Sequence, residues 1–433
     1  MSSPGRTRWT YCQTLRAFIC SWKNCGVAEL SCRALIDGAV ASKFSSGHFD
    51  NFEVQVASKL VNGNLSDIKP IIQVRTEQIL DREIGRPREW TKFNAYTLSQ
   101  TIMKHVSGRV VFGEALADNP AFMAAMERYT MKVIPYAVGL RYLNLGPLRD
   151  VLMFFIHLRQ RHHLAAATRF VTDEIATRKR AQSKEAFREE QRPVDCVQWA
   201  MDQEIAEEAK RPESIAHRLL HLSAAIVDTP RVAMMNLLYD MASHGDCLDE
   251  IRAEIVECLA DSGGGWTEAS MANMKKLDSF IQECLRMNPG IVMLTGWRIV
   301  MADSFRFDDD LTLPKGTTLV FPTAHMFTDP DYFPNPDQFD PLRFYRMKEE
   351  ARQSGSAALS KDIRFEWLTF GYGRQACPGR FYSLRLLKTI LGEIIMRYDV
   401  RYAGGERPRP PSLDLEPLTV PDPTIELEFR ARD

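Results

Sequence analysis

Several features of special protein classes are absent from this chain of 433 residues. The richest apolar run, Val151 to Ile156, is six residues long, whereas a membrane-spanning helix needs ~18 or more. The formal net charge of −1 gives no support for a nucleic-acid partner. Nine cysteines are too sparse for a disulfide scaffold, and 24 glycines with 23 prolines do not fit a collagen-like or low-complexity chain. What remains is the composition of a globular protein with ample apolar material for a core.

The first 48 residues contain no recognisable element. No C-x-x-C pair occurs among the four cysteines there, so a zinc module is not predicted. Residues 1–28 carry four basic side chains, and the first acid is Glu29. This pattern is compatible with an organelle transit peptide or with a solvated, poorly ordered tail, and we favour the tail. We therefore treat residues 1–48 as an atypical N-terminal segment.

Helical spacing dominates the middle of the chain. Apolar residues recur at three- and four-residue intervals in Tyr96–Val111 and in Leu219–Met241, and residues 275–287 give the cleanest amphipathic pattern. A last long helix is expected to carry its apolar stripe from Leu387 to Tyr398. These patterns predict a mainly α-helical fold.

Strand-like sequence is confined to the C-terminal part. Val292–Met301, Thr317–Phe321 and Thr424–Phe429 are expected to be strands, and the prolines of residues 328–345 exclude a regular helix there. Residues 178–192 mix both charge signs densely, so we interpret them as a solvated helix face that Pro193 ends. The fold class is therefore mainly α with a small β part.

A glycine-rich loop with one cysteine precedes the last helix. Residues 370–380 read FGYGRQACPGR. A thiolate at Cys377 would gain from the positive end of that helix, and a lone cysteine suits a metal whose other ligands come from a macrocycle. The alternative is a dinucleotide fingerprint in Gly371-x-Gly373-x-x-Ala376. That fingerprint needs a βαβ unit, which the following sequence does not supply.

This loop resembles the haem-binding loop of the cytochrome P450 family, F-x-x-G-x-[RH]-x-C-x-G, at all but one position. The resemblance places the axial thiolate, and thus the metal ligand, at Cys377. The departure is Gln375, where the family has Arg or His reaching a haem propionate, because Gln can donate a hydrogen bond but brings no charge. The resemblance assigns the other cofactor contacts of the loop to Phe370, Gly371, Gly373, Arg374, Gln375 and Gly379.

Two upstream motifs support the resemblance. Glu283 and Arg286 are three residues apart on one predicted helix, so their side chains meet. In the family this E-x-x-R pair is completed by an arginine of a proline-rich meander, and the segment Phe339–Phe344 places Arg343 in that role. The resemblance also makes Arg298 a candidate for binding a haem propionate.

The predicted helix 216–243 carries a segment similar to the oxygen-activation motif of the family, A-[GA]-x-[DE]-T. The resemblance makes Asp228 and Thr229 the catalytic pair that supplies protons for cleavage of dioxygen. Two departures are Ile226, in a place that is usually small, and Pro230, which removes a helical N–H. The alternative is that Asp228 caps a helix that begins at Thr229 and Pro230.

The resemblance implies a haem domain over residues 49–433 with incomplete N-terminal β elements, binding heme b, iron protoporphyrin IX. It further implies a monooxygenase that uses dioxygen and electrons from NADPH-cytochrome P450 reductase to oxidise a lipophilic metabolite, terpenoid or polyketide-like. The motif wording is most similar to P450s of filamentous-fungal secondary metabolism, whose members usually sit on the cytosolic face of the endoplasmic reticulum. The alternative function is a catalytically impaired, haem-binding pathway component without turnover.

Overall fold

The computed structural model describes residues 27–29, 61–130, 148–183, 188, 192–203, 211–263, 265–290, 295–300, 302–307, 311–353, 368–371, 376–405, 407–415 and 418–432. The chain forms two compact units, which we call the small unit and the large unit. The small unit comprises Met1–Ala34, Gln282–Cys377 and Ser412–Val420. The large unit comprises Leu35–Ile281, Pro378–Pro411 and Pro421–Asp433.

Helices make up most of the large unit. They are α4 (Leu65–Glu83), α5 (Ala95–Ala117), α7 (Leu148–Gln182), α8 (Cys196–Asp202), α9 (Pro212–Ser243), α10 (Leu248–Ala260), α11 (Glu268–Asn273) and α15 (Arg380–Arg397), with single turns of 3-10 helix at Asn62–Asn64 and Gly245–Cys247. Another helix, α12 (Lys275–Met287), crosses the boundary between the units.

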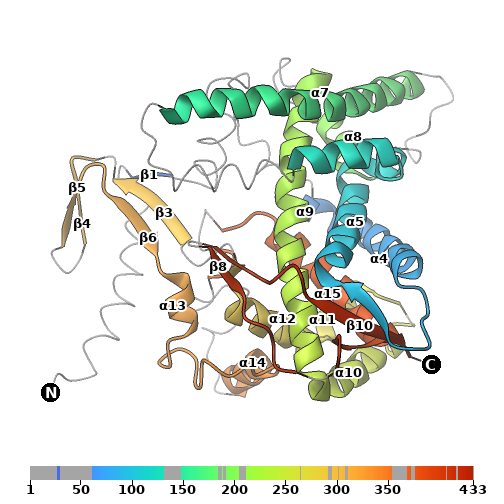
Figure 1. Cartoon of the computed structure of the whole chain (residues 1–433), viewed down its shortest axis with the longest axis vertical. Coiled ribbons are helices and arrows are strands. Elements are labelled where there is room, and N and C mark those ends of the chain that lie inside the picture. The colour runs from blue at the N-terminus through green and yellow to red at the C-terminus, as the bar shows by residue number, and fades with distance from the viewer. Residues whose placement is uncertain are drawn as a thin grey trace. The chain divides into compact units, whose positions relative to one another are not determined.

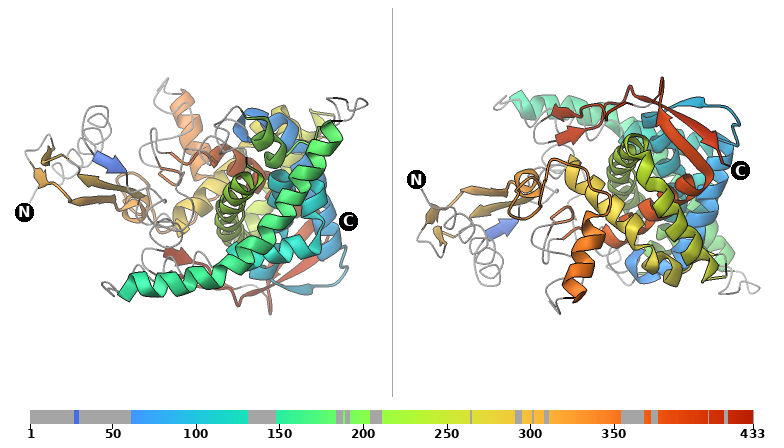
Figure 2. Two further views of the ribbon diagram at one scale, coloured as in Figure 1. Left: turned by 90° about the horizontal axis from the view of Figure 1, so that it is seen from above. Right: turned by 90° about the horizontal axis from the view of Figure 1, so that it is seen from below.

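The long helix α9 is the centre of the large unit. It packs against α5, α7, α8 and α15, and α7 crosses it near its N-terminal end (Figures 1 and 2). Twenty of its side chains are buried, mostly apolar ones such as Leu219, Met234 and Leu238. Burial on nearly all sides explains why its sequence is apolar beyond a single stripe.

Helix starts in the large unit follow from local hydrogen bonds. Asn94 caps α5 by accepting from the Thr97 N–H at 2.9 Å, and Thr267 forms a capping box with Ser270 at α11. The carboxylate of Glu254 accepts the Lys276 N–H at 2.8 Å and so satisfies a free end of α12.

A break in α5 is fixed by a buried ion pair. Gly113 has φ +78°, and a Cβ there would lie 2.3 Å from Asp195 Oδ2, so only glycine fits. Arg178 donates to both oxygens of Asp195 at 2.7 and 2.9 Å, and its side chain is 6% exposed. The interpretation of residues 178–192 as a solvated helix face is therefore wrong at Arg178, and α7 ends at Gln182.

One antiparallel sheet completes the large unit. Its order is β2 (Thr91–Asn94), β10 (Glu426–Ala431) and β7 (Tyr398–Tyr402). Glu426 pairs with Asn94, and Leu427 pairs with both Phe93 and Tyr402. The C-terminal strand is thus the middle strand, which ties the end of the chain to the segment between α4 and α5.

The small unit contains three antiparallel strand groups. They are the sheet β1 (Val27–Glu29), β3 (Thr295–Val300) and β6 (Thr318–Phe321), the hairpin β4 (Ser304–Arg306) with β5 (Thr312–Pro314), and the hairpin β8 (Leu413–Leu415) with β9 (Leu418–Val420). Val300, Phe305 and Phe307 form its apolar cluster with Leu313 and Leu319. The helices α13 (Thr323–Phe327) and α14 (Arg343–Gln353) flank the meander between them.

The predicted mainly α fold with a small β part is confirmed. Residues 275–287 form α12 with the predicted bounds, and the three predicted strands are β3, β6 and β10 with shifted ends. None of the helices that the structure describes is both long and apolar enough to span a membrane.

Candidate functional site

The loop before α15 presents a cysteine at its surface. The Cys377 N–H donates to the Phe370 carbonyl oxygen at 2.7 Å, and the Gly371 N–H donates to the Leu368 carbonyl oxygen at 2.9 Å. Gly371 has φ +72°, the left-handed region that favours glycine. These bonds hold the two ends of the loop together, and Cys377 is exposed. Gly379 follows as the N-cap of α15.

The remaining predicted cofactor contacts are described in part. Gly373, Arg374 and Gln375 lie outside the described residues. Arg298 lies in β3, where its backbone pairs with Glu29 and Leu319, and its side chain lies outside the described part. Phe370 is half-buried beside the buried Thr369.

Cys377 differs from the other described cysteines. It is exposed, whereas Cys196, Cys258 and Cys284 are buried and Cys247 is half-buried. Burial raises the pKa of the Cys196 thiol well above its ordinary value and that of Cys247 to about 12, so these two stay protonated. An accessible sulfur just before a helix N-terminus fits the axial thiolate of a haem, because a metal must reach the sulfur and the helix end favours its negative charge.

The predicted acid and two arginines meet in the small unit. Glu283 is 0% exposed and accepts from Arg286 Nε at 2.9 Å and Arg286 Nη2 at 2.8 Å. Arg343 Nε lies 3.0 and 3.1 Å from its two oxygens, and the Asp340 N–H donates to it at 3.0 Å. Every oxygen of this buried carboxylate therefore has charged donors.

The two arginines also hold the meander. Arg286 Nη1 donates to the Phe327 carbonyl oxygen at 2.6 Å. Arg343 Nη2 donates to the carbonyl oxygens of Asn335 and Gln338 at 3.1 and 2.9 Å, and its Nη1 donates to that of Pro334. The ion cluster thus fixes irregular backbone that no helix or sheet stabilises.

The predicted catalytic pair lies in the middle of α9. The helix runs unbroken from Pro212 to Ser243, so the alternative that Asp228 caps a new helix is wrong. Apolar burial on both sides of Pro230 keeps the helix continuous despite the lost N–H. The Thr229 hydroxyl donates to the Ala225 carbonyl oxygen at 2.7 Å.

Thr229 and Asp228 face different surroundings. Thr229 is exposed, as is Ala225 one turn earlier, although most of α9 is buried. Asp228 is 6% exposed, and its nearest cation is Arg231 Nε at 3.5 Å from Oδ1. Its Oδ2 is buried without a hydrogen-bond partner. Within the described part of the chain, Asp228 contacts Arg231 and Thr229 contacts Ala225, and no hydrogen bond joins Asp228 to Thr229.

Burial dominates the electrostatics of Asp228. Desolvation raises the pKa of this carboxyl, and the charge of Arg231 offsets the rise in part. Arg231 itself lies over the ring of Tyr96, with Cζ 4.7 Å from the ring centroid. Neither Arg231 nor Tyr96 was predicted from the sequence to be a site residue. The i,i+3 spacing of Asp228 and Arg231 is a signal that could have identified the ion pair.

The family follows from a match along most of the chain. A sequence profile described as Cytochrome P450 matches residues 54–429. The chain belongs to the cytochrome P450 family. The predicted resemblance is confirmed, and a P450 binds haem iron and uses dioxygen with a redox partner.

Curated relatives agree with this assignment. Aspergilol synthase AuAP450 of Aspergillus ustus is 61% identical over 427 residues, which cover 98% of this chain and 78% of that protein. Cytochrome P450 monooxygenase sttB of Aspergillus terreus is 44% identical over 410 residues, covering 95% and 77%. The predicted monooxygenase activity and the similarity to fungal P450s are thus confirmed.

A solved structure shows the same fold. Retinoic acid-bound cyanobacterial CYP120A1 has a TM-score of 0.66 with 18% sequence identity, and the alignment covers 97% of this chain and 88% of that one. The P450 fold predicted from the motifs is therefore confirmed.

Proposed function

We propose that this P450 uses heme b, held through Cys377, to insert one oxygen atom into a C–H bond of a lipophilic fungal secondary metabolite, terpenoid or polyketide-like. The observation that carries the proposal is the exposed Cys377 in a loop closed by its own N–H. Haem with a thiolate ligand supplies dioxygen activation, with two electrons and two protons consumed and one oxygen atom leaving as water.

Residues of α9 are assigned to the proton supply. The Thr229 hydroxyl donates a hydrogen bond to the Ala225 carbonyl oxygen, so the hydroxyl oxygen remains able to accept a hydrogen bond from a water. Its exposure lets that water reach it. Burial raises the pKa of Asp228, so its carboxyl takes up a proton more readily than an exposed aspartate does, and the charge of Arg231, which offsets the rise in part, favours release of that proton.

Apolar side chains around Thr229 on α9 support a lipophilic substrate. Ala225 and Thr229 are exposed on α9 between the half-buried Ile226, Val232 and Ala233, a mostly hydrocarbon surface. Met293 and Leu294, which the sequence assigns to a substrate-facing strand region, lie outside the described residues. The Aspergillus ustus relative is named aspergilol synthase, which supports a role in natural-product synthesis.

NADPH-cytochrome P450 reductase is the proposed electron donor. We assign Arg374, Arg380 and Arg385 to its docking because their basic charge suits an acidic partner surface. Arg385 pairs with Glu268 within the chain, and Arg380 lies over the Phe381 ring at 4.3 Å. Arg374 lies outside the described residues.

The test is turnover with added reductase. Haem-loaded protein, NADPH and a panel of terpenoid and polyketide substrates should give an oxygenated product, with NADPH consumed in proportion. The alternative, a haem-binding component without turnover, is favoured by the pairing of Asp228 with Arg231 rather than with Thr229. Haem incorporation without product on any substrate would select that alternative.

A further inference from the structure

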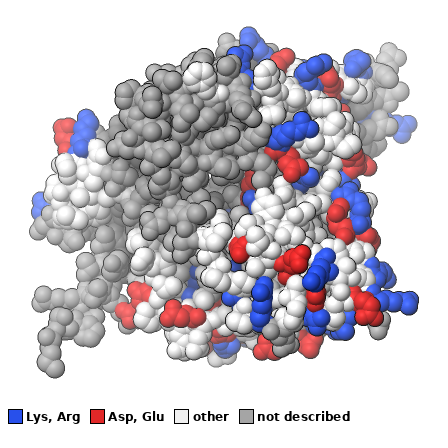
Figure 3. Space-filling model, viewed as in Figure 1, with Lys and Arg blue, Asp and Glu red and all other residues white. Residues whose placement is uncertain are grey.

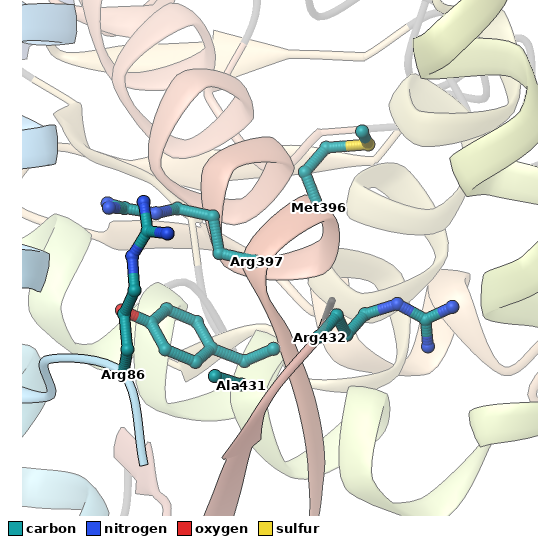
Figure 4. Close-up of a pocket in the computed structure, with 6 residues that line it drawn as sticks. Arg86, Met396, Arg397, Ala431 and Arg432 are labelled. Carbon is teal, nitrogen blue, oxygen red and sulfur yellow. The ribbon is translucent and has the colours of Figure 1, made fainter. Parts of the chain in front are cut away.

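A pocket in the large unit is lined by arginines and contains none of the residues assigned to catalysis. Its lining residues are Arg86, Met396, Arg397, Tyr398, Ala431 and Arg432 (Figure 4). They come from the turn after α4, the junction of α15 with β7, and the end of β10. None of the six is acidic, so the lining itself is strongly cationic.

Backbone and hydroxyl bonds fix the walls of this pocket. The Tyr398 hydroxyl donates to the Gly85 carbonyl oxygen at 2.9 Å. The Ala431 N–H donates to the Pro87 carbonyl oxygen at 2.7 Å, and the Arg432 N–H donates to that of Arg397 at 2.9 Å. Three distant segments are therefore joined before any ligand arrives, which lowers the entropic cost of binding.

Two of the arginines are placed as a pair. Arg86 and Arg397 line the same pocket and their side chains extend toward the same region in Figure 4, while Arg432 points away from them. Arg397 Nη2 pairs with Asp81, but its Nη1 is buried and finds no acceptor in the described part of the chain. Arg86 is exposed and has no ion pair there either. Two neighbouring cations of which only one has a paired carboxylate repel each other unless a further anion joins them.

The surrounding acids do not remove the excess charge. Asp399 is divided among Arg432, Arg430 at 3.1 Å and Arg252 at 3.4 Å. Burial alone would raise the pKa of Asp399, but hydrogen bonds from Arg432 and Arg430 hold it below its ordinary value.

Two further acids stand near these arginines. Asp249 pairs with Arg252 at 2.6 Å, and Glu393 lies close enough to Arg397 for their charges to interact. Burial raises the pKa of Glu393, which weakens its contribution. Figure 3 shows charges of both signs interspersed on the face it displays, so the Arg86–Arg397 pair is a local feature rather than part of a broad basic field there.

The geometry points to a phosphate-binding site at Arg86 and Arg397. A planar guanidinium fork matches the oxygens of a phosphate, and a dianion offsets both cations at once. The ligand is the free ion or the phosphomonoester headgroup of a lipid such as phosphatidic acid. A phosphate bound to both arginines connects the turn after α4 with the end of α15, and therefore stabilises the large unit independently of turnover.

The experiment measures the thermal midpoint of the haem-loaded protein with inorganic phosphate or with chloride at equal ionic strength. Phosphate should raise the midpoint saturably by about 3 °C or more, since a ligand that binds only the folded state stabilises it. The shift should disappear in Arg86→Gln and fall strongly in Arg397→Lys. It should persist in Arg88→Gln, an exposed arginine two residues away that does not line the pocket.

Co-sedimentation with vesicles separates the two sources of phosphate. If the protein binds vesicles of phosphatidic acid in phosphatidylcholine, and Arg86→Gln loses this binding while Arg88→Gln keeps it, the ligand is the lipid headgroup. If the thermal shift occurs but the protein binds no vesicles, the ligand is the free ion. Equal phosphate responses of wild type, Arg86→Gln and Arg88→Gln would overturn the proposal. Loss of turnover has no bearing on this result, so failure of the proposed function is distinguishable.

Discussion

Helices α9 and α12 of this P450 each carry a buried acid followed three residues later by an arginine. In α12, Glu283 is fully buried, and its carboxylate accepts hydrogen bonds from the side chains of Arg286 and Arg343 and from a backbone N–H. In α9, Asp228 is nearly as buried, but its one cation stands 3.5 Å away and one carboxylate oxygen has no partner. The same residue types at the same spacing thus give one satisfied and one unsatisfied carboxylate.

The difference shows what each carboxylate can do. A carboxylate enclosed by donors from three chain segments joins those segments through charge-assisted hydrogen bonds. A buried carboxylate with an incomplete set of partners costs stability, and its pKa rises. Unsatisfied buried groups of this kind mark functional positions in cleft-bearing proteins. We therefore assign stability to Glu283 and proton transfer to Asp228.

The largest effect is expected for Glu283→Gln. The amide leaves two buried guanidinium groups without a counter-charge, so unfolding in urea should show a loss of about 3–5 kcal/mol, or no folded protein at all. Glu349→Gln, which removes an exposed pair with Arg352, should cost less than about 1 kcal/mol. Equal losses in both variants would contradict the structural role of Glu283.

Asp228→Asn should instead lower activity. An amide cannot hold or release the proton, so product formation with reductase should fall by about 10²-fold while the haem spectrum stays near wild type and the unfolding midpoint does not fall. Asp246→Asn, an exposed acid just after α9, serves as the control. Unchanged product formation in Asp228→Asn would remove Asp228 from the mechanism.

Substitution of the two arginines sharpens the contrast. Arg286→Gln should cost about 3–5 kcal/mol of unfolding free energy, because Glu283 loses two charged donors in the interior. Arg231→Gln should cost only about 1 kcal/mol, from the lost contact with the Tyr96 ring and a weak ion pair. If urea unfolding finds the two losses similar, the distinction between the pairs fails.

The smallest effect is a pH dependence. The folded-state pKa of Asp228 lies above its unfolded value, so the folded state binds more protons between the two. The contribution of Asp228 to folding stability is present below about pH 4, the ordinary pKa of an aspartate, and is lost as the pH rises through the folded-state pKa. The stability of wild type relative to Asp228→Asn should therefore decrease as the pH rises above about pH 4, and a flat or rising difference would show that the pKa is not raised.

Short sequence patterns predicted correctly those elements whose start, end and buried face are set by residues within the element itself. Residues 275–287 form α12 with the expected bounds because a clean apolar stripe and Pro289 mark them. The hairpin of β8 and β9 was missed, since its proline-rich surroundings show no alternation. The cap predicted at Asp228 was wrong, because Pro at a helix start and Pro inside a buried helix look alike in sequence.

Long-range pairs could be predicted only where a motif named both partners. Arg343 was matched to Glu283 across 60 residues by family motifs, and the structure places them in contact. No motif linked Arg178 to Asp195, so the buried arginine was taken for a solvated one. The Arg86 and Arg397 pocket joins three distant segments and has no local signal at all.

The most direct test of the account is the spectrum of the reduced, carbon-monoxide-bound protein. Wild type should show the red-shifted Soret band of thiolate-ligated haem, and Cys377→Ala should lack it while Cys247→Ala keeps it. A red-shifted band that survives in Cys377→Ala, or wild-type protein that stays colourless with ample haem, would contradict ligation by Cys377.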